Sequence, residues 1–222
     1  MPRNILKKIG SSFTWYIIEN TPFYKDITIS GVWKKEKYTS SVQSCIREYI
    51  PLLYNQLVQN ILAKTVDNPI TKKFDIKTSS DLHKYTKKQF IADKECEVYK
   101  YKLIHTPTQT VYASRPHKYQ EGYKVFISTT DKYSVFIDEC GMTQSIVFIQ
   151  CSSKEEAKKK LELLQHPLYV FINNICRWGN FNNIRILQKF PIPNLPSYSN
   201  HTEIYNYFNI TEAEIKYIQE HL

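Results

Sequence analysis

The sequence predicts an α+β fold, with an N-terminal helical segment, a central mostly antiparallel or mixed sheet, and C-terminal helices. Two observations lead to this prediction. Apolar residues recur at helical spacing around residue 50 and again after residue 153, whereas the apolar period changes to two between residues 98 and 150. Elements separated along the chain in this order are typical of α+β proteins rather than of alternating βαβ units.

The first predicted element is an amphipathic helix over residues 40–64. The segment SSVQSCIREYIPLLYNQLVQNILAK has apolar side chains close to helical spacing, and its leading serines are suitable caps. Pro51 is expected to kink or divide this helix, because proline lacks the backbone N–H donor. The polar segment that follows is expected to be a loop, with a short helix beginning near Ser80.

The sheet is expected from short segments that are rich in β-branched and aromatic residues and are separated by turns. They cover residues 98–104, 110–113, 124–128, 133–137 and 145–150.

Helices are expected again from residue 153 onward. Ser153 and Glu156 match a capping box that opens a helix, and Pro167 is placed to end that helix and to start the next one. Thr211 and Glu214 match a second capping box for the C-terminal helix, with a short helix before it around EIYNYF.

Composition narrows the class of protein. Hydrophobic residues make up 42% of the 222 residues and aromatic residues 14%, which favours a folded chain. Long apolar runs are missing, and MPRNILKKIG is not followed by the apolar stretch of a signal peptide, so a cytoplasmic location and no membrane partner are expected. The cysteines are scattered without zinc-site spacing, and reduced thiols are expected at positions 45, 96, 140, 151 and 176.

The charge indicates an anionic partner. The chain has 30 Lys and Arg against 21 Asp and Glu, a formal net charge of +9. Such an excess favours nucleic acid as the first candidate partner.

Several catalytic motifs are missing from the sequence. No two glycines lie within three residues of each other, which excludes a Gly-x-Gly-x-x-Gly dinucleotide loop and a Walker loop. No Pro-Pro dipeptide is present either, so the Asp/Asn-Pro-Pro-aromatic tetrapeptide that grips a flipped adenine is absent. The six histidines are dispersed, and none is next to a serine or cysteine in a nucleophile motif. No complete active site is therefore expected in this chain.

Basic and aromatic residues are interleaved in three predicted loops, at 114–124, 128–133 and 177–185. Arginine pairs with phosphate or guanine, asparagine pairs with adenine, and an aromatic ring stacks on or wedges against a base. We therefore expect the loops to contact DNA through Arg115, Lys118, Tyr119, Lys124, Lys132, Tyr133, Arg177, Trp178, Asn180, Asn182, Asn183 and Arg185.

A structural explanation of the same loops stays open. In it Tyr119, Tyr123, Trp178 and Phe181 pack beneath the loops, while the lysines and arginines only solvate the surface. In either case Gly179 is expected to let the backbone turn or approach another segment closely.

The order of several segments resembles a known family. KVFIS, DECGMTQSIVFIQ, the SSKEEA helix, RWGNFNNIRILQKFPIP and the terminal YFNITEAEIKYIQ resemble the C-terminal target-recognition region of type II restriction-modification N6-adenine DNA methyltransferases, TaqI-like and fused enzymes included. The resemblance covers most of residues 100–222, and IGSSFTWYIIENTPF resembles the exit from the catalytic domain of such enzymes. The family elements match at 141–145, 152–157, 190–193 and 211–219.

The resemblance implies a division into an N-terminal helical or linker region, 1–95, and a target-recognition domain, 96–222. It also implies duplex DNA and a catalytic methyltransferase domain or subunit as partners. That partner would bind S-adenosylmethionine, and no cofactor is expected in this chain. The glycine-rich cofactor loop and the Pro-Pro tetrapeptide of the family are missing, so the chain resembles the recognition half alone, either as a fragment or as a separate specificity subunit.

Two other functions remain open at this point. Asp67, Asp75 and Lys77 loosely match the acids and lysine of a small metal-dependent endonuclease, which holds Mg²⁺ beside a phosphate. A protein-interaction module is the other alternative, in which the apolar face of the helix at 40–64 would pack on a partner.

Overall fold

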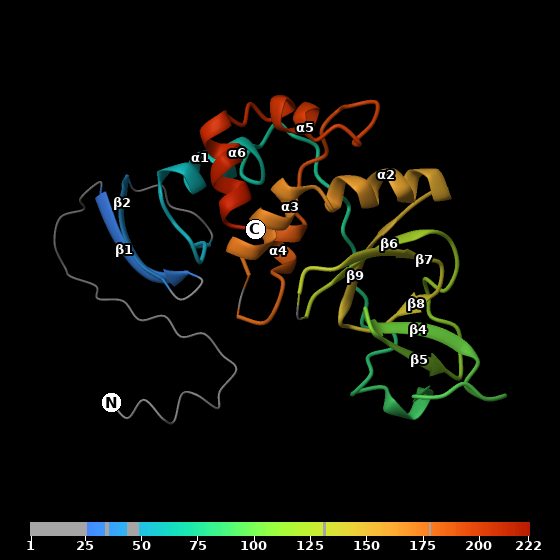
Figure 1. Cartoon of the computed structure of the whole chain (residues 1–222). Helices are drawn as coiled ribbons and strands as arrows, with labels where there is room; N and C mark the ends of the chain where they lie inside the picture. Colours follow the sequence, from blue (N-terminus) through green and yellow to red (C-terminus); the bar gives the residue numbers. More distant parts are fainter. Residues whose placement is uncertain (1–25, 34–35, 44–48, 131, 178) are drawn as a thin grey trace, which may run out of the picture.

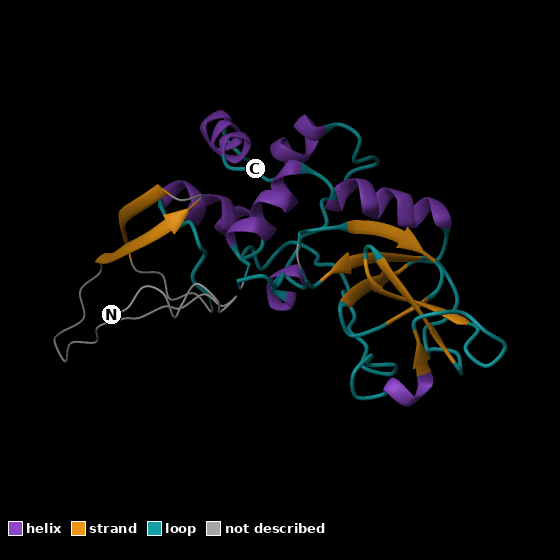
Figure 2. Cartoon of the chain, turned by 60° about the horizontal axis from the view of Figure 1, so that its bottom comes forward, coloured by secondary structure: helices purple, strands orange, loops and turns teal. Residues whose placement is uncertain are grey.

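The computed structural model of the chain describes residues 26–33, 36–43, 49–130, 132–177 and 179–222. These residues form an elongated molecule, with a two-stranded hairpin at one end, a group of helices in the middle and two small sheets at the other end (Figures 1 and 2). The α+β prediction is confirmed.

The hairpin replaces part of the expected N-terminal helix. Strand β1 (Asp26–Trp33) pairs antiparallel with β2 (Glu36–Gln43), so the segment 40–43 is strand and the prediction of a helix there is wrong. Residues 44–48 of the expected helix lie outside the described residues.

Helix α1 (Gln56–Lys64) is the part of that prediction that the structure contains. It begins after Asn55, whose side chain accepts a hydrogen bond from the backbone N–H of Val58 over 3.0 Å. Asparagine is a strong N-cap, and Pro51 lies before the helix rather than inside it. The helix is therefore shorter than its apolar pattern suggested.

The strands form two further sheets, and all five predicted strands are confirmed within three residues at each end. One sheet has the order β3-β5-β4-β8, with β4 and β8 parallel, and the other is antiparallel with the order β7-β6-β9. The bounds are β3 (Ile91–Ala92), β4 (Tyr101–Thr106), β5 (Gln109–Ala113), β6 (Lys124–Ser128), β7 (Val135–Asp138), β8 (Gly141–Met142) and β9 (Ile146–Gln150). The helix expected near Ser80 is absent from this described region, where a single 3-10 turn, η2 (Lys88–Phe90), comes later.

The β7-β6-β9 sheet is buried on both faces. Along β6, Val125 and Ile127 belong to the main core, whereas Phe126 belongs to a second core that also contains Phe148 of β9. Strand side chains point alternately to opposite faces, so one strand serves two cores. Helix α2 (Lys154–Leu164) packs on β6 and β7.

The C-terminal helices are confirmed. They are α2 (Lys154–Leu164), α3 (Pro167–Ile175), α4 (Ile184–Leu187), α5 (His201–Tyr207) and α6 (Glu212–Glu220), of which the short α4 was not predicted.

Their caps follow the predicted residues with one difference. Thr211 and Glu214 form a reciprocal capping box. Ser153 accepts from the N–H of Glu156 over 3.1 Å, but the Glu156 carboxylate accepts instead from the backbone and hydroxyl of Ser152. The first box is therefore only half formed, and the neighbouring serine supplies the other donors.

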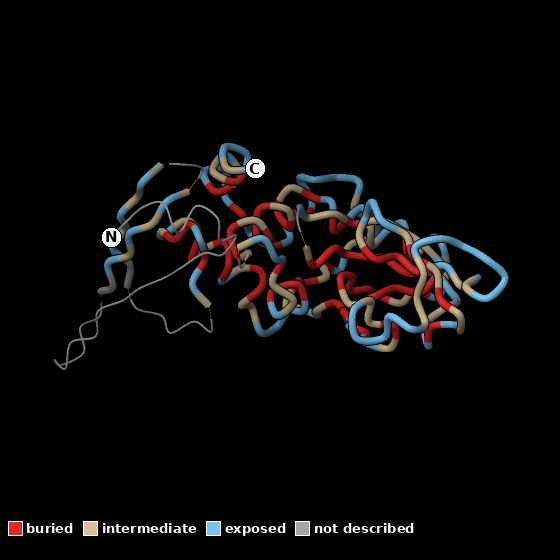
Figure 3. Tube along the Cα trace, turned by 90° about the horizontal axis from the view of Figure 1, so that it is seen from below, coloured by how far each residue is buried: buried red, intermediate tan, exposed pale blue. Residues whose placement is uncertain are grey.

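The main core joins residues from both sides of the boundary expected at 95. Ile61 and Leu62 of α1 share it with Phe171 of α3 and Leu187 of α4. Buried segments run through the central helices and the sheets, whereas the hairpin is mostly exposed or half-buried (Figure 3). None of the helices in the described ranges has the length and hydrophobicity that a membrane-spanning helix needs. Cys140, Cys151 and Cys176 are buried, Cys96 is exposed, and Cys45 lies outside the described residues.

Candidate nucleic-acid interface

Two of the three loops predicted to contact DNA lie side by side. Thr130 and Phe181 form an antiparallel backbone bridge, and the N–H of Asn182 donates to the carbonyl of Thr129 over 2.9 Å. Figure 1 shows the connection between α3 and α4 beside the turn between β6 and β7. We name the described residues of 128–134 and 176–185 the paired-loop surface.

Buried polar contacts fix the backbone of this surface. The side-chain amide of Asn182 donates to the carbonyl of Ser128 over 2.8 Å, and its oxygen accepts from the amide of Asn173 in α3 over 2.9 Å. The Ser128 hydroxyl donates to the carbonyl of Thr130 over 2.6 Å. Gly179 has a φ of +61°, the left-handed conformation that glycine adopts without strain, which agrees with the turn expected there.

Four side chains are exposed on the paired-loop surface: Lys132, Asn180, Phe181 and Arg185. Among the residues that the structure describes, no ion pair includes Lys132 or Arg185. Phe181 is 59% exposed, so the alternative in which it packs beneath the loop is wrong. It was not among the expected contacts, because in the sequence analysis its ring was considered only as one that packs beneath the loop.

Other expected contacts on these loops have structural roles instead. Asn182 is buried, and Asn183 caps α4 by accepting from the N–H of Arg185 over 3.1 Å. The Tyr133 hydroxyl donates to the carbonyl of Leu164 over 3.0 Å, and burial raises the pKa of this tyrosine. Arg177 is half-buried two residues after the end of α3, and Trp178 lies outside the described residues.

In the third loop, 114–124, Arg115 is bound to the protein itself. Its guanidinium pairs with the carboxylate of Asp81 over 2.7 Å, and the N–H of Lys118 donates to the same carboxylate over 2.8 Å. The hydrogen bond from Arg115 holds the pKa of Asp81 below its usual range. This ion pair fixes the loop against the segment around Asp81 and engages the arginine that was expected to bind DNA.

Lys124 is fully buried at the start of β6. Its ammonium donates to the backbone carbonyls of Glu121, Gly122 and Glu139 over 2.9, 2.6 and 3.0 Å. Burial lowers the pKa of this lysine. A lysine without exposed surface cannot contact a phosphate, so Lys124 is removed from the expected contacts.

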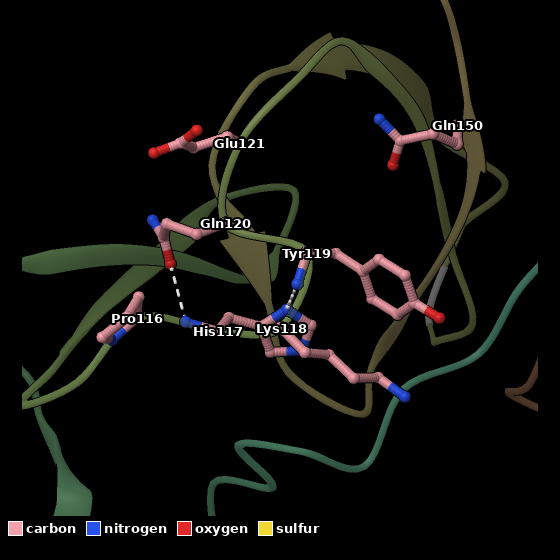
Figure 4. A pocket seen from close by; sticks show the side chains of 7 residues that line it. All are labelled: Pro116, His117, Lys118, Tyr119, Gln120, Glu121 and Gln150. Carbon is pink, nitrogen blue, oxygen red and sulfur yellow. Dashed lines mark hydrogen bonds between the residues drawn. The ribbon is translucent and has the colours of Figure 1, made fainter.

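Lys118 and Tyr119 border a shallow hollow of about 480 Å³ (Figure 4). Lys118 is exposed and lies over the Tyr119 ring, 4.9 Å from its centroid, and that ring packs 4.8 Å from the ring of Phe148. The hollow is lined by Pro116, His117, Lys118, Tyr119, Gln120, Glu121 and Gln150. Among the predicted contacts in this loop, Lys118 is the only residue of the described structure that has an exposed charge and makes no ion pair.

The fold also brings together a serine and a histidine that are distant in sequence. Ser79 Oγ lies 2.8 Å from Nε2 of His117, and the N–H of Tyr119 donates to Nδ1 of His117 over 3.0 Å. Because Nδ1 accepts, a neutral imidazole carries its proton on Nε2 and donates it to the serine. A histidine that acts as a general base must instead accept the serine proton on Nε2, so His117 does not activate Ser79 as a nucleophile. Burial lowers the pKa of His117 to about 4, in keeping with the neutral form.

The residues of the endonuclease alternative make local contacts. Lys77 pairs with Asp75 over 3.2 Å, and the Tyr49 hydroxyl lies 3.3 Å from both carboxylate oxygens of Asp67. In the described part of the chain, no group of three or more His, Cys, Asp or Glu side chains could hold a metal ion.

In the protein-interaction alternative, the apolar face of the helix at 40–64 would pack on a partner. In the structure, the part of this face that lies in α1 packs in the chain's own core. Val58, Ile61 and Leu62 of α1 are completely buried. A second hollow of about 540 Å³ lies between the 68–72 and 192–207 segments, and the exposed Ile70 and Tyr207 are among the residues that line it.

Comparison with known proteins finds no family model that matches the chain and no curated protein sequence that matches it. These comparisons assign no family to the chain.

Proposed function

We propose that this chain binds duplex DNA in a sequence-specific manner, as the target-recognition part of an adenine-specific DNA methyltransferase or restriction-modification enzyme. The observation that most supports the proposal is the paired-loop surface. Two segments with basic, amide and aromatic residues are joined by the Thr130–Phe181 bridge, and they expose Lys132, Asn180 and Arg185 together.

The chemistry of these side chains suits DNA. A lysine neutralises a phosphate, an arginine pairs with a phosphate or with the O6 and N7 of guanine, and an asparagine pairs with adenine. The net charge of +9 supports attraction to a polyanion. The fixed loop backbone supports specificity, because a rigid element positions base contacts more accurately than a mobile one.

The rest of the proposal depends on the family resemblance. The catalytic partner, a separate domain or subunit, binds S-adenosylmethionine and transfers the methyl group, while this chain places the target sequence. Removing the target adenine from the helix is then a joint action of the two parts.

The test is selection from a library of random duplexes by the full chain, followed by measurement of the affinity for the selected and a scrambled sequence. We expect one sequence to be enriched. Loss of a bidentate base contact costs about 1–3 kcal/mol of discrimination, so Asn180→Ala or Arg185→Ala should reduce the affinity ratio between the two duplexes. No enrichment, with equal affinity for both duplexes, would contradict sequence-specific binding.

The same preparation tests the endonuclease alternative. Plasmid is incubated with the chain and Mg²⁺, and with the Asp75→Asn variant as control. Under our proposal the plasmid stays intact with both proteins. Cleavage by the wild type that the variant has lost would favour the endonuclease.

A further inference from the structure

Phe181 presents its ring to solvent from a fixed backbone. Its backbone bridges to Thr130, and the next residue, Asn182, is tied to Thr129 and Ser128 by hydrogen bonds of 2.9 and 2.8 Å. These contacts fix the main chain at Phe181 and at the residue that follows it. The side chain itself is 59% exposed.

The surroundings of this ring differ from those of an isolated exposed apolar residue. Asn180 and Arg185 are exposed on the same connection between α3 and α4, and Lys132 is exposed on the neighbouring turn. An exposed aromatic ring on a surface that also carries two cations is the combination that single-stranded nucleic acid sites use, where bases stack on rings and cations hold the backbone.

We propose that Phe181 stacks on a nucleobase that has left the duplex stack. This inference rests on the proposed function, and it names the ligand of the ring: an unpaired base rather than a paired one. In an intact duplex both faces of each base are covered by its neighbours, so an aromatic side chain gains contact only with a base that is unstacked or bulged. The ring then keeps such a base out of the helix.

The test compares binding of the full chain to two duplexes of the same sequence, one perfectly paired and one with a single-base bulge. Removal of an aromatic partner from one stacked base reduces affinity by about 5-fold to 150-fold. We therefore expect the wild type to prefer the bulged duplex by at least about fivefold. Phe181→Ala and Phe181→Leu should lose this preference, and Phe181→Tyr should keep it because the ring is retained.

A fluorescent base provides the second readout. With 2-aminopurine as the bulged base, stacking on the ring quenches its emission in the complex with the wild type, and the quenching should be absent with Phe181→Leu. Tyr85→Ala is the matched control, because Tyr85 is also an exposed aromatic residue, at 68%, but lies outside the paired-loop surface. This control should keep both the preference and the quenching.

The outcomes separate the two proposals. If the Phe181 variants keep the bulge preference and the quenching while the chain still binds duplex DNA, stacking by Phe181 is wrong and the proposed function stands. If the wild type binds neither duplex, both are wrong. Thermal unfolding of each variant verifies folding, and the leucine variant decides the question if the alanine variant does not fold.

Discussion

The side-chain amide of Asn182 donates a 2.8 Å hydrogen bond to the carbonyl of Ser128, the last residue of β6. It thereby joins the connection between α3 and α4 to the β6–β7 turn. The sequence analysis predicted that Asn182 contacts DNA. In the structure its side chain is buried instead and holds the two candidate DNA-contacting loops together.

The first prediction concerns this anchor. Asn182→Ala leaves the Ser128 carbonyl and the Asn173 amide without their partner inside the protein. Because an unsatisfied buried polar group costs about 1–3 kcal/mol, the free energy of unfolding should fall by at least that amount. Chemical denaturation measures it.

The exposed Asn180 is the matched control for Asn182. Asn180→Ala should change the free energy of unfolding by less than about 0.5 kcal/mol, as is usual for exposed positions, while it weakens DNA binding. Equal stability of the two alanine variants would contradict the anchoring role of Asn182.

The second prediction concerns Lys124. Lys124→Met keeps most of the side-chain volume but removes the donor from three backbone carbonyls, so the unfolding free energy should fall by about 2–3 kcal/mol. Lys118→Met is the control, because its ammonium is exposed over the Tyr119 ring, and it should leave stability nearly unchanged. If Lys118→Met is the more destabilised of the two in urea unfolding, the assignment of Lys124 to the scaffold is wrong.

The third prediction is a pH dependence. Burial lowers the pKa of His166 to about 4 from an ordinary value of 6.5, and the rings of His201 and Tyr205 face it. Between these pH values the unfolded chain binds more protons than the folded chain, so stability falls as the pH falls from 6.5 towards 4. One histidine with this shift in pKa contributes up to about 3 kcal/mol to that loss of stability.

The variant His166→Asn removes the contribution of this histidine to the pH dependence. The asparagine oxygen can still accept from the N–H of Leu168, as Nδ1 of His166 does over 3.2 Å, but the side chain no longer titrates. Urea unfolding at several pH values should therefore show a shallower loss of stability for the variant. The same loss in both proteins would show that His166 does not contribute.

Local signals in the sequence were sufficient for much of the fold. The strand at 124–128 was predicted to the residue, because apolar and β-branched side chains end there at clear turn signals. The helix at 40–64 was predicted too long, because apolar spacing outweighed two local signals, Pro51 and the strong N-cap Asn55. The short α4 has too few residues for a periodic pattern.

The candidate site was harder to predict from the sequence than the fold. The loops were predicted, but their pairing depends on how α3 packs, which no local pattern encodes. A lysine is expected at the surface, and the burial of Lys124 depends on carbonyls that converge only in the fold, such as that of Glu139. Likewise the backbone bridge between Phe181 and Thr130 joins residues that are far apart in the sequence, so no local pattern predicts it.

The salt dependence of duplex DNA binding tests the central claim most directly. Each phosphate contact by a lysine or arginine contributes about one unit to the slope of log affinity against log salt concentration. We predict that the wild type binds with a steep slope and that the double variant Lys132→Ala/Arg185→Ala is shallower by up to about two units. The control is Lys154→Ala/Lys158→Ala, which removes two exposed charges from α2 and should keep the slope of the wild type. Equal slopes for the two double variants, or no salt-dependent binding by the wild type, would contradict DNA binding through the paired-loop surface.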